Sequence, residues 1–540
     1  MVEYDVVIVG GAFSGSSAGI LLKRARPDLR VLIVESRTAF DRKVGESTSD
    51  IAGCFLTRVL RQHSWLVQNQ LPKQGLRFWF NAAEGQPPND EPHRCGEIGA
   101  YFQVRLPTFQ LDRATLDEHL LDEARALGCE VQRPAKVKNI VLGGAGNNVL
   151  EIENGGGWST VRAQWVIDAS GKAAMLARKN GTLEKLGEHP TNSIWARFRG
   201  VRDLDGWEAT QALAKCPMSA IAAARMMATN HLTGRGWWCW LIPLKNGDFS
   251  AGLTWDTRFF TPEPGANIGD RLKRHLLSHP IGKLMFEDAE PIEHDTRAYS
   301  QLAYFNSQAA GDGWICIGDA AGFMDPLYSH GLDYCAHTAC AARRIILQAL
   351  DGMDGGALAK TYAVDYKTSY HRWYYALYHN KYEYLGDSEL MWAAFLLDLS
   401  TYFFGPVYGV YSQTEVEFAK LPYIGPGGAF FGWWMRAYNR RLTAIARKRL
   451  TAGIYGRRNL DHRHLLKIGF APGPKALPLM RAGLWQWLKL ELHALFLKTP
   501  PAAKTAAMHK PETPAETSAK PDEMETQQND TAATPPAMQV

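Results

Sequence analysis

Short apolar runs and segments of helical spacing alternate over the first part of the chain. Residues 4–9 and 31–34 are mostly β-branched apolar residues, a pattern typical of parallel strands buried on both faces. Between them, residues 14–26 are rich in Ala and Leu and stop before Pro27, which predicts a helix. The chain therefore begins with one predicted βαβ unit.

Patterns further along mix helices with more strands. Asn246-Gly247 lies between two apolar runs and favours a tight hairpin turn. The expected elements are a helix over residues 111–127, strands over 137–154 and 158–167 with a Gly-rich turn between them, a hairpin of 237–243 and 249–255, and a strand over 314–317 before a helix that ends near Leu350. This mixture predicts an α/β fold of the mixed α+β kind.

The last third of the chain has a different pattern. Residues 363–411 and 430–450 have helical spacing and many aromatic residues, and residues 484–497 continue with a shorter amphipathic segment. After Pro500 the sequence is mainly Pro, Ala, Thr, Glu and Lys without an aromatic residue. We therefore expect a helical, aromatic-rich region over residues 351–498 and a disordered tail over residues 499–540.

Composition narrows the functional classes. Among 540 residues, 60 are basic and 55 acidic, and the net charge of +5 is too small to indicate nucleic-acid binding. The eight cysteines form no CxxC pair, and no zinc-finger spacing occurs, so we expect no metal site and reduced thiols in the cytoplasm. The N-terminus lacks the basic residues of a signal peptide, and without a run of about 18 apolar residues we expect no spanning helix. The cysteines are Cys54, Cys95, Cys129, Cys216, Cys239, Cys316, Cys335 and Cys340.

A glycine-rich turn joins the first strand to the first helix. Glycines let the backbone approach a pyrophosphate, and the helix N-terminus supplies free N–H groups. Glu35 ends the second strand, where a carboxylate can bind ribose hydroxyls. The middle glycine of the usual GxGxxG is replaced by Ala12, so the match is imperfect. The residues predicted to bind a dinucleotide here are Gly10, Ala12, Phe13, Ser14, Gly15, Glu35 and Arg37.

Later motifs favour FAD over NAD. Residues 166–171 resemble the strand and turn on the adenine side of FAD-dependent oxygenases, and Gly318-Asp319 resembles their GD motif, whose Asp meets the ribityl chain. Arg113 stands where those enzymes have Asp-Arg at a helix start. The resemblance implies a Rossmann-type FAD-binding domain of the p-hydroxybenzoate-hydroxylase-like class over residues 1–350. It also implies an interleaved antiparallel substrate-domain sheet from about residues 70–110 and 185–300.

Four segments resemble the flavin-dependent halogenases, the tryptophan-halogenase-like branch of the FAD-dependent monooxygenase superfamily. They are residues 43–48, like a VGES/T stretch; 73–79, a lysine before an aromatic-rich strand; 238–243, which fit WxWxIP; and 325–331, like DPxxSxG. The resemblance runs from the N-terminus to about Tyr334 and is vaguer to about Leu450. It adds Lys43, Gly45, Glu46, Ser47, Arg113, Asp319, Pro326, Gly331 and Leu332 to the expected cofactor-binding residues.

The resemblance implies a reaction. Reduced FAD, supplied by a separate flavin reductase, and oxygen would oxidise chloride or bromide to hypohalous acid, which Lys73 would hold by a hydrogen bond or as a haloamine. The substrate would be an electron-rich aromatic compound of secondary metabolism, phenolic or pyrrole-like, free or tethered to a carrier protein. For a lysine taken alone, a solvated surface position is the commoner interpretation.

Two further roles follow from the resemblance. Trp238 and Trp240 alternate along a strand, so both face one side, where they would wall the flavin off from the substrate. Ser329, His330 and Gly331 would present backbone N–H groups to the halide. The family more often has Ser or Thr in place of His330, so a hydrogen-bonded structural histidine is the simpler interpretation of that residue, with proton donation as an alternative.

Other functions remain open at this point. A monooxygenase on the same fold would hydroxylate an aromatic or lipid-like substrate. A geranylgeranyl-reductase-like enzyme, which reduces double bonds, would share the sequence motif of residues 318–326. An FAD-binding interaction module without turnover is a fourth interpretation. The aromatic and basic stretch of residues 430–449 is most simply an amphipathic helix with a solvated face, and it also fits contact with a membrane or an acidic carrier protein.

Overall fold

A computed structural model describes residues 1–100, 106–213, 225–466 and 471–497. Its first sheet has the central strand order β18-β19-β10-β1-β2-β7, in which β1 (Val2–Val9) pairs in parallel with β2 (Val31–Val34) and β10 (Gly157–Asp168). Helix α1 (Phe13–Ala25) joins β1 to β2. The predicted βαβ unit is confirmed: residues 6–9 of β1 and all of β2 are buried, as expected of parallel strands covered on both faces.

The prediction of one strand over residues 137–154 is wrong. The chain forms two antiparallel strands there, β8 (Ala135–Val141) and β9 (Asn148–Asn154), and β9 also pairs with β10. Gly144 and Gly146, with φ of +86° and +82°, form the turn between them. Glycine adopts this left-handed conformation without the steric cost of a Cβ atom, so the glycines end the strand inside the predicted range.

The second sheet is built from distant parts of the chain, in the order β16-β12-β15-β14-β13-β4-β5-β21. The predicted hairpin of β14 and β15 is confirmed. The sheet was expected to be antiparallel, and two of its pairs are parallel instead: β4 with β13, and β5 with β21. Strand β21 comes from the region that was expected to be helical. The strands are β4 (Leu76–Phe80), β5 (Gly96–Ala100), β12 (Thr191–Arg199), β13 (Thr229–Gly234), β14 (Trp237–Pro243), β15 (Phe249–Asp256), β16 (Glu290–Tyr299) and β21 (Arg463–Leu466).

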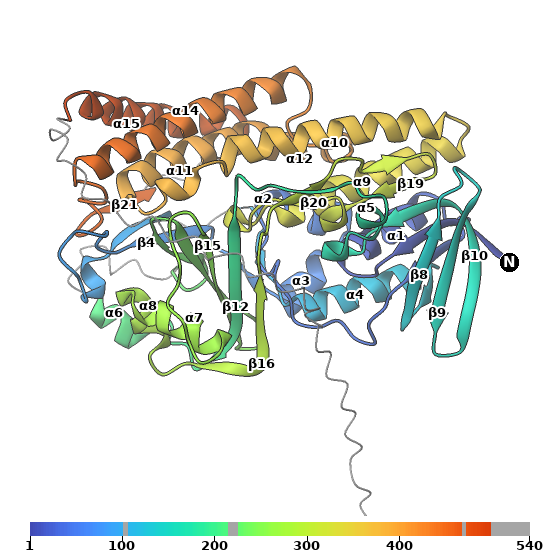
Figure 1. The fold of residues 1–540 in the computed structure, drawn as a ribbon, viewed down its shortest axis with the longest axis horizontal. Coiled ribbons are helices and arrows are strands. Elements are labelled where there is room, and N and C mark those ends of the chain that lie inside the picture. The colour runs from blue at the N-terminus through green and yellow to red at the C-terminus, as the bar shows by residue number, and fades with distance from the viewer. Residues whose placement is uncertain (101–105, 214–224, 467–470, 498–540) are drawn as a thin grey trace, which may run out of the picture. The chain divides into compact units, whose positions relative to one another are not determined.

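Long helices cover both sheets on one side (Figure 1). The main ones are α9 (Gly331–Leu350), α10 (Gly355–Leu377), α11 (Ser388–Tyr402), α14 (Gly425–Thr451) and α15 (Leu477–Leu495). Strand β14 divides its residues between two cores. Trp238 and Trp240 join the core that includes the helices, whereas Cys239 and Leu241 join a second core with α7 (Ile268–Leu277) and α8 (Pro280–Phe286).

Shorter elements complete the described part. They are α2 (Asp50–Cys54), α3 (His63–Asn69), β3 (Leu71–Pro72), β6 (Phe109–Gln110), α4 (Arg113–Ala126), β7 (Glu130–Gln132), α5 (Met175–Lys179), β11 (Leu183–Lys185), α6 (Trp207–Ala212), β17 (Tyr304–Asn306), β18 (Ala310–Gly311), β19 (Trp314–Cys316), β20 (Gly322–Phe323), α12 (Tyr408–Ser412) and α13 (Thr414–Phe418). Cys216 and the predicted disordered tail lie outside the described residues, and the other seven cysteines are free and buried.

One helical stretch bears on the expectation of no membrane span. Residues Ser388–Ser412 are long and apolar enough to cross a membrane by length and composition alone. The expectation was based on unbroken apolar residues, whereas this stretch is apolar on average and contains polar ones, so the expectation stays a prediction. About two thirds of its most apolar window (67%) is buried inside the protein, as in a core helix.

Candidate active site

The glycine turn after β1 is shaped to accept a pyrophosphate. Gly10 has a φ of +98°, and a Cβ atom there would lie 2.5 Å from the carbonyl oxygen of Ala169. Ala12 is the N-cap of α1, and no side chain caps the helix, whose first turn contains no acidic residue. The free N–H groups of the first turn are therefore available to an anion, which fits the phosphates of FAD.

Glu35 fits the expected ribose site. Its Oε2 accepts a hydrogen bond from the N–H of Gly11 at 2.8 Å, and its Oε1 accepts one from the N–H of Arg37 at 2.9 Å. The carboxylate is thus buried between the glycine turn and the end of β2. The guanidinium of Arg37 is exposed and faces Asp41 at 3.8 Å.

Several predicted cofactor residues from separate segments lie together. Arg113 donates to the carbonyl of Val44 at 3.3 Å and pairs with Asp117 at 3.1 Å, and Lys43 pairs with the same Asp117 at 2.5 Å. A Cβ atom on Gly45 would lie 2.5 Å from Nη1 of Arg113 and 4.0 Å from Cδ2 of Leu332. The loop after β2, the start of α4 and the start of α9 therefore converge.

Asp319 of the GD motif belongs to the same neighbourhood. Burial raises the pKa of its carboxyl group, and the positive charges of Arg113, Lys43 and Lys172 oppose that rise. The carboxyl group lines a small cavity of about 20 Å³, which Gly331 and His330 also border. Asp319, expected at the ribityl chain, thus shares one cavity with His330 and Gly331, two of the three residues expected at the halide, whereas Ser329 is not among the lining residues of that cavity.

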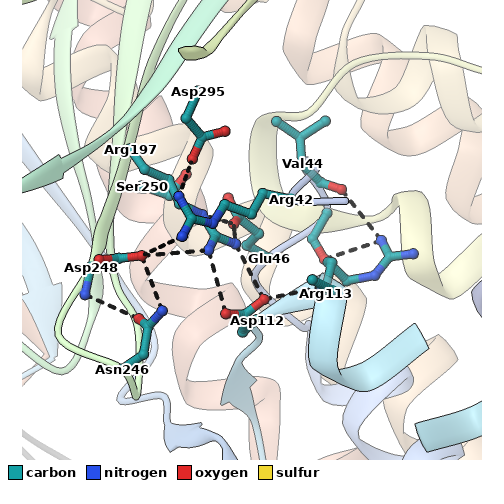
Figure 2. Close-up of polar contacts among 12 residues, drawn as sticks. Arg42, Val44, Glu46, Asp112, Arg113, Arg197, Asn246, Asp248, Ser250 and Asp295 are labelled. Carbon is teal, nitrogen blue, oxygen red and sulfur yellow. Dashed lines mark hydrogen bonds and ion pairs between the residues drawn. The ribbon is translucent and has the colours of Figure 1, made fainter. Parts of the chain in front are cut away.

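Glu46 and Ser47 use their side chains to attach this loop to the second sheet, and Figure 2 shows the contacts of Glu46. The carboxylate of Glu46 pairs with Arg197 of β12 at 2.7 Å, and Arg197 also faces Asp112 at 3.3 Å. Ser47 hydrogen-bonds to Thr229 at 2.9 Å. These contacts give both side chains a structural role, and their binding to a cofactor stays a prediction.

Arg42 strengthens the same attachment from the outside. It pairs with Asp295 of β16 at 3.1 Å and with Asp248 at 3.7 Å, and Asn246 hydrogen-bonds to Asp248 at 3.0 Å (Figure 2). The loop of residues 42–47 is therefore held between the two sheets. Sequence reasoning missed Arg197, since nothing in a strand sequence shows which acid lies opposite.

The turn of residues 325–331 is fixed by buried hydrogen bonds. Oδ2 of Asp325 accepts from the hydroxyl of Tyr382 at 2.9 Å and lies 2.8 Å from Nε2 of His189. Pro326 precedes Leu327, whose N–H donates to Oδ1 of Asp325 at 2.9 Å. Tyr328 and Ser329 both have positive φ values, 68° and 64°. Such conformations cost about 1–3 kcal/mol each, and they occur where surrounding structure holds a functional turn.

His330 stands between the small cavity and a larger one of about 140 Å³ and lines both. Its Nδ1 lies 2.8 Å from Oδ2 of Asp333. Asp333 also accepts from the N–H of Ala52 at 3.1 Å and from the hydroxyl of Ser49. His330 is thus hydrogen-bonded as the structural interpretation predicts, and its position also suits a role between cofactor and substrate.

Lys73 lies on the wall of the larger cavity and is only 4% exposed, so the surface interpretation is wrong. Its ammonium group donates to the carbonyl of Thr48 at 2.7 Å. Burial lowers its pKa to about 8, although the charges of Asp50 and Asp333 act in the opposite direction. A lysine with such a pKa is partly neutral, and therefore nucleophilic, near neutral pH.

Asp50 is a site residue that sequence reasoning missed. It begins α2 and lines the larger cavity, and its Oδ1 has no hydrogen-bond partner among the described residues. Burial raises its pKa to about 7. The sequence offered one indication of this role: Asp50 lies two residues after the VGES/T-like segment of residues 43–48. The same segment contributes Thr48, whose carbonyl accepts from Lys73.

A second buried lysine, Lys381, lies behind the same cavity. Its ammonium group is 2.5 Å from Oδ2 of Asp398 and 3.2 Å from the hydroxyl of Tyr328, and Tyr438 donates to Oδ1 of Asp398 at 2.5 Å. Asp398 and Tyr328 line the cavity among mostly apolar side chains from α10, α11 and α14. The cavity therefore suits an apolar ring with few polar groups.

Trp238 and Trp240 lie on one face of β14, as predicted, and are buried. The indole N–H of Trp238 donates to Tyr382 at 2.8 Å, which in turn holds Asp325, and that of Trp240 faces Ser250 at 3.2 Å. The described residues that line the two cavities do not include either indole. Their gating role stays a prediction, and what the structure adds is support for the 325–331 turn.

Comparison with known proteins identifies the family of the chain. The profile of the tryptophan halogenase family matches residues 100–379, more than half of the chain. The tetracycline 7-halogenase of Kitasatospora aureofaciens is 27% identical over 348 residues, which cover 61% of this chain and 60% of that protein, less than two thirds of its length. A 1H-pyrrole-2-carbonyl peptidyl-carrier-protein brominase of Pseudoalteromonas luteoviolacea is 28% identical over 365 residues, covering 65% of this chain and 79% of that protein.

The fold is similar to that of a solved halogenase. The crystal structure of halogenase PltM superposes with a TM-score of 0.70 and 18% identity, covering 90% of this chain and 98% of that one. Another crystal structure of PltM is a complex with phloroglucinol and FAD. At this identity the likeness concerns the fold, whereas the profile match concerns the sequence itself. The chain belongs to the tryptophan halogenase family, within the FAD-dependent enzymes known as flavin-dependent halogenases.

Proposed function

We propose that the protein is an FAD-dependent halogenase that uses reduced FAD, oxygen and chloride or bromide to halogenate an electron-rich aromatic substrate. The observation that carries the proposal is Lys73, a buried amine with a pKa of about 8 on the wall of a mostly apolar cavity. His330, which follows the strained turn, and Trp373 line both this cavity and the small one that Asp319 lines. A hydroxylase or a double-bond reductase has no comparable need for a buried amine at this place.

The chain's residues divide the work between the two cavities. When bound, reduced FAD with oxygen supplies the oxidising power that makes halide electrophilic. Gly10, Glu35 and the first turn of α1 would hold its pyrophosphate and ribose, and Asp319 its ribityl chain. Gly331 begins α9, which no side chain caps, so the N–H groups of Gly331 and Leu332 would be the ones to meet a halide. Asp333 lies in the same turn, where its carboxylate opposes an anion, and its side chain is engaged by His330 and Ser49.

On the substrate side, Lys73 would bind the electrophilic halogen species and Asp50 would exchange protons with it. Their pKa values of about 8 and about 7 let both groups change protonation state near neutral pH. The apolar wall excludes water, which protects the halogenating species from hydrolysis. As the halogen adds to the ring, the ring must lose a proton, and the unpaired Oδ1 of Asp50 is a suitable acceptor.

The relatives indicate the class of substrate. One acts on a pyrrole held by a carrier protein, and a protein of similar fold binds phloroglucinol, a phenol. Both rings are electron-rich, and a cavity of about 140 Å³ with few polar groups suits either of them. We therefore propose a phenolic or pyrrole-like substrate, free or carrier-tethered, with reduced FAD supplied by a separate flavin reductase.

A single-turnover experiment tests the proposal. The enzyme loaded with reduced FAD is mixed with oxygen, with and without chloride or bromide, in the presence of a small electron-rich phenol. Halogenated phenol should form with halide only and should vanish in Lys73→Ala. Lys138→Ala, which alters an exposed lysine paired with Glu153, should behave as wild type.

Other outcomes select the rival functions. A hydroxylated product that depends neither on halide nor on Lys73 would show a monooxygenase. Reaction with oxygen no faster than that of free flavin, together with reduction of an added alkene, would show a reductase. FAD binding without any turnover would favour the fourth interpretation, an FAD-binding interaction module.

A further inference from the structure

Helix α15 is apolar on two sides, but only one of them is covered. Gly483 and Leu490 are buried on the side that packs against α11, and a Cβ atom on Gly483 would lie 2.9 Å from the side chain of Leu397. On the other side large apolar residues face outward, among them Trp485 at 58% exposure and Leu495 at 71%. We call this outer set the α15 stripe: Leu484, Trp485, Leu488, Leu492, Leu495 and Phe496.

The α15 stripe is continuous. Its members recur at intervals of one, three and four residues, so at 3.6 residues per turn they share one face of the helix and its C-terminal end. Single exposed apolar residues are ordinary, but six large ones in a row are not. The row needs a partner that the described chain does not provide.

The surroundings of the α15 stripe are strongly basic. Helices α14 and α15 together contain eight basic residues and one acidic residue, whereas the whole chain of 540 residues carries a net charge of only +5. The one acid, Glu491, is already paired with Arg441 at 2.6 Å, which also joins the two helices. Seven of the eight basic residues are exposed. Arg441 pairs with Glu491 and Arg447 with Glu383. The other five exposed residues are Arg436, Arg440, Lys448, Arg481 and Lys489.

These observations decide among possible partners. Residues 499–540 contain no Leu, Ile, Phe, Tyr or Trp, and their three Met and one Val are too few and too far apart to cover a row of six large apolar side chains. A second copy of the chain would bring two basic helix pairs together, which like-charge repulsion opposes. An acidic carrier protein would match the charges, but it would need an apolar groove as long as the row to cover all six side chains. An anionic lipid surface satisfies both features, because acyl chains accept the apolar side chains and headgroups attract the basic ones.

We propose that the α15 stripe and the basic residues around it bind the surface of an anionic membrane. Helix α14 contributes two more exposed aromatic side chains, Phe430 and Trp433. On its inner side, Met435 of α14 lines the larger cavity, so this helix borders both that cavity and the proposed membrane surface. In Figure 1, α14 and α15 lie together at the outer edge of the helical layer. The inference does not depend on the halogenase proposal.

The test is co-sedimentation of the full-length, FAD-loaded protein with vesicles. Vesicles of phosphatidylcholine with about one third phosphatidylglycerol should bind it at low salt, and vesicles of phosphatidylcholine alone should bind it far less. Leu488→Glu combined with Leu492→Glu should weaken binding at least tenfold. Lys489→Glu combined with Arg440→Glu should weaken it as well, and added salt should weaken binding of the wild type.

Matched controls separate lipid contact from misfolding and from other partners. Trp485→Phe should retain binding, and so should Trp158→Glu, which alters an exposed tryptophan on β10. All variants should keep the wild-type melting temperature, because the changed side chains are exposed.

Three results would overturn the proposal. The first is no binding to anionic vesicles. The second is binding that the charge reversals abolish but the Leu488→Glu and Leu492→Glu pair leaves intact, as expected for an acidic protein partner. The third is a wild-type dimer in sedimentation velocity that this Leu→Glu pair converts to a monomer.

Discussion

Two buried lysines flank one cavity, and their surroundings give them different tasks. Lys381 lies against the carboxylate of Asp398 and the hydroxyl of Tyr328, so its charge is neutralised where it sits. Lys73 donates to a backbone carbonyl at 2.7 Å and feels Asp50 and Asp333 only as nearby charges. Burial lowers the pKa of both. The comparison shows that an amine becomes available for chemistry when it is buried without a carboxylate in contact.

The same contrast holds for two buried acids. Glu97 contacts Arg77, Arg225 and Arg463, which hold its pKa at about 2 although burial acts to raise it. Asp50 has no arginine partner within the described part of the chain, and burial raises its pKa to about 7. The paired members, Lys381 and Glu97, hold the fold together, and the unpaired members, Lys73 and Asp50, lie at the cavity.

The largest expected effect is that of Lys73→Met on activity. Halogenation should fall by about 10²- to 10⁴-fold, because the change removes the group that binds or transfers the halogen. The free energy of unfolding should not fall, and we expect a rise of about 1–3 kcal/mol at pH 7, since a buried ammonium with a lowered pKa destabilises the fold. Product assays and urea titration of one preparation measure both. A fall in stability equal to that of Lys381→Met would contradict the claim that Lys381 stabilises the fold and Lys73 does not.

Lys381→Met should show the opposite pattern. Loss of one partner from a buried ion pair costs about 3–5 kcal/mol, because Asp398 is left charged without its cation. The melting temperature should fall, while turnover below that temperature should stay within about tenfold of wild type. The double variant Lys381→Met with Asp398→Leu should recover part of the lost stability. If it is less stable than the single variant, the pair is not the cause.

Glu97→Gln tests the paired acid through pH. In wild type the folded pKa is about 2, below the ordinary 4.5, so Glu97 stabilises the fold above about pH 4.5 and loses that effect as pH falls towards 2. The variant should be less stable by about 3 kcal/mol at pH 7, and the difference should shrink below pH 4. Urea midpoints from pH 3 to pH 7 measure this. A difference that stays constant over this range would mean that the arginines do not control the carboxyl group.

Asp50→Asn should change the pH dependence of activity. Asp50 raises the pKa of Lys73, so removing its charge should lower that pKa below about 8. The limb of the kcat/KM profile that reports Lys73 should therefore move to lower pH, whichever protonation state is active, and the maximal rate should fall by about tenfold or more. Asp50→Glu should restore part of both. A profile identical to wild type would remove Asp50 from the mechanism.

Trp238→Phe should have the smallest effect. The change removes one hydrogen bond to Tyr382, worth about 1 kcal/mol, and thereby loosens the turn that carries His330. Activity should change by less than about fivefold, because a loss of about 1 kcal/mol corresponds to a rate factor of about that size. Trp240→Phe, which loses a longer bond to Ser250, is the matched control. Formation of hydroxylated product by Trp238→Phe would instead support the gating role.

The local fold was largely predictable. The βαβ unit, the β14–β15 hairpin and the long C-terminal helices follow from apolar periodicity and turn residues, which act within a few positions of the chain. The strand predicted over residues 137–154 failed because glycines inside it turn the chain back. Strand β21 was not predicted, since its pairing with β5 joins segments more than 350 residues apart.

By itself, the sequence determined the family and the cofactor motifs, because glycine turns, Glu35 and the signature segments are local patterns that a flavin site requires. Only the tertiary structure decided which polar groups meet. It placed Lys73 beside Asp50 rather than beside a paired carboxylate, gave Lys381 the partner Asp398, and turned Glu46 towards Arg197. The physical reason is that pKa, charge pairing and water exclusion depend on distances across the fold, and these are set by packing between distant segments rather than by neighbours in the chain.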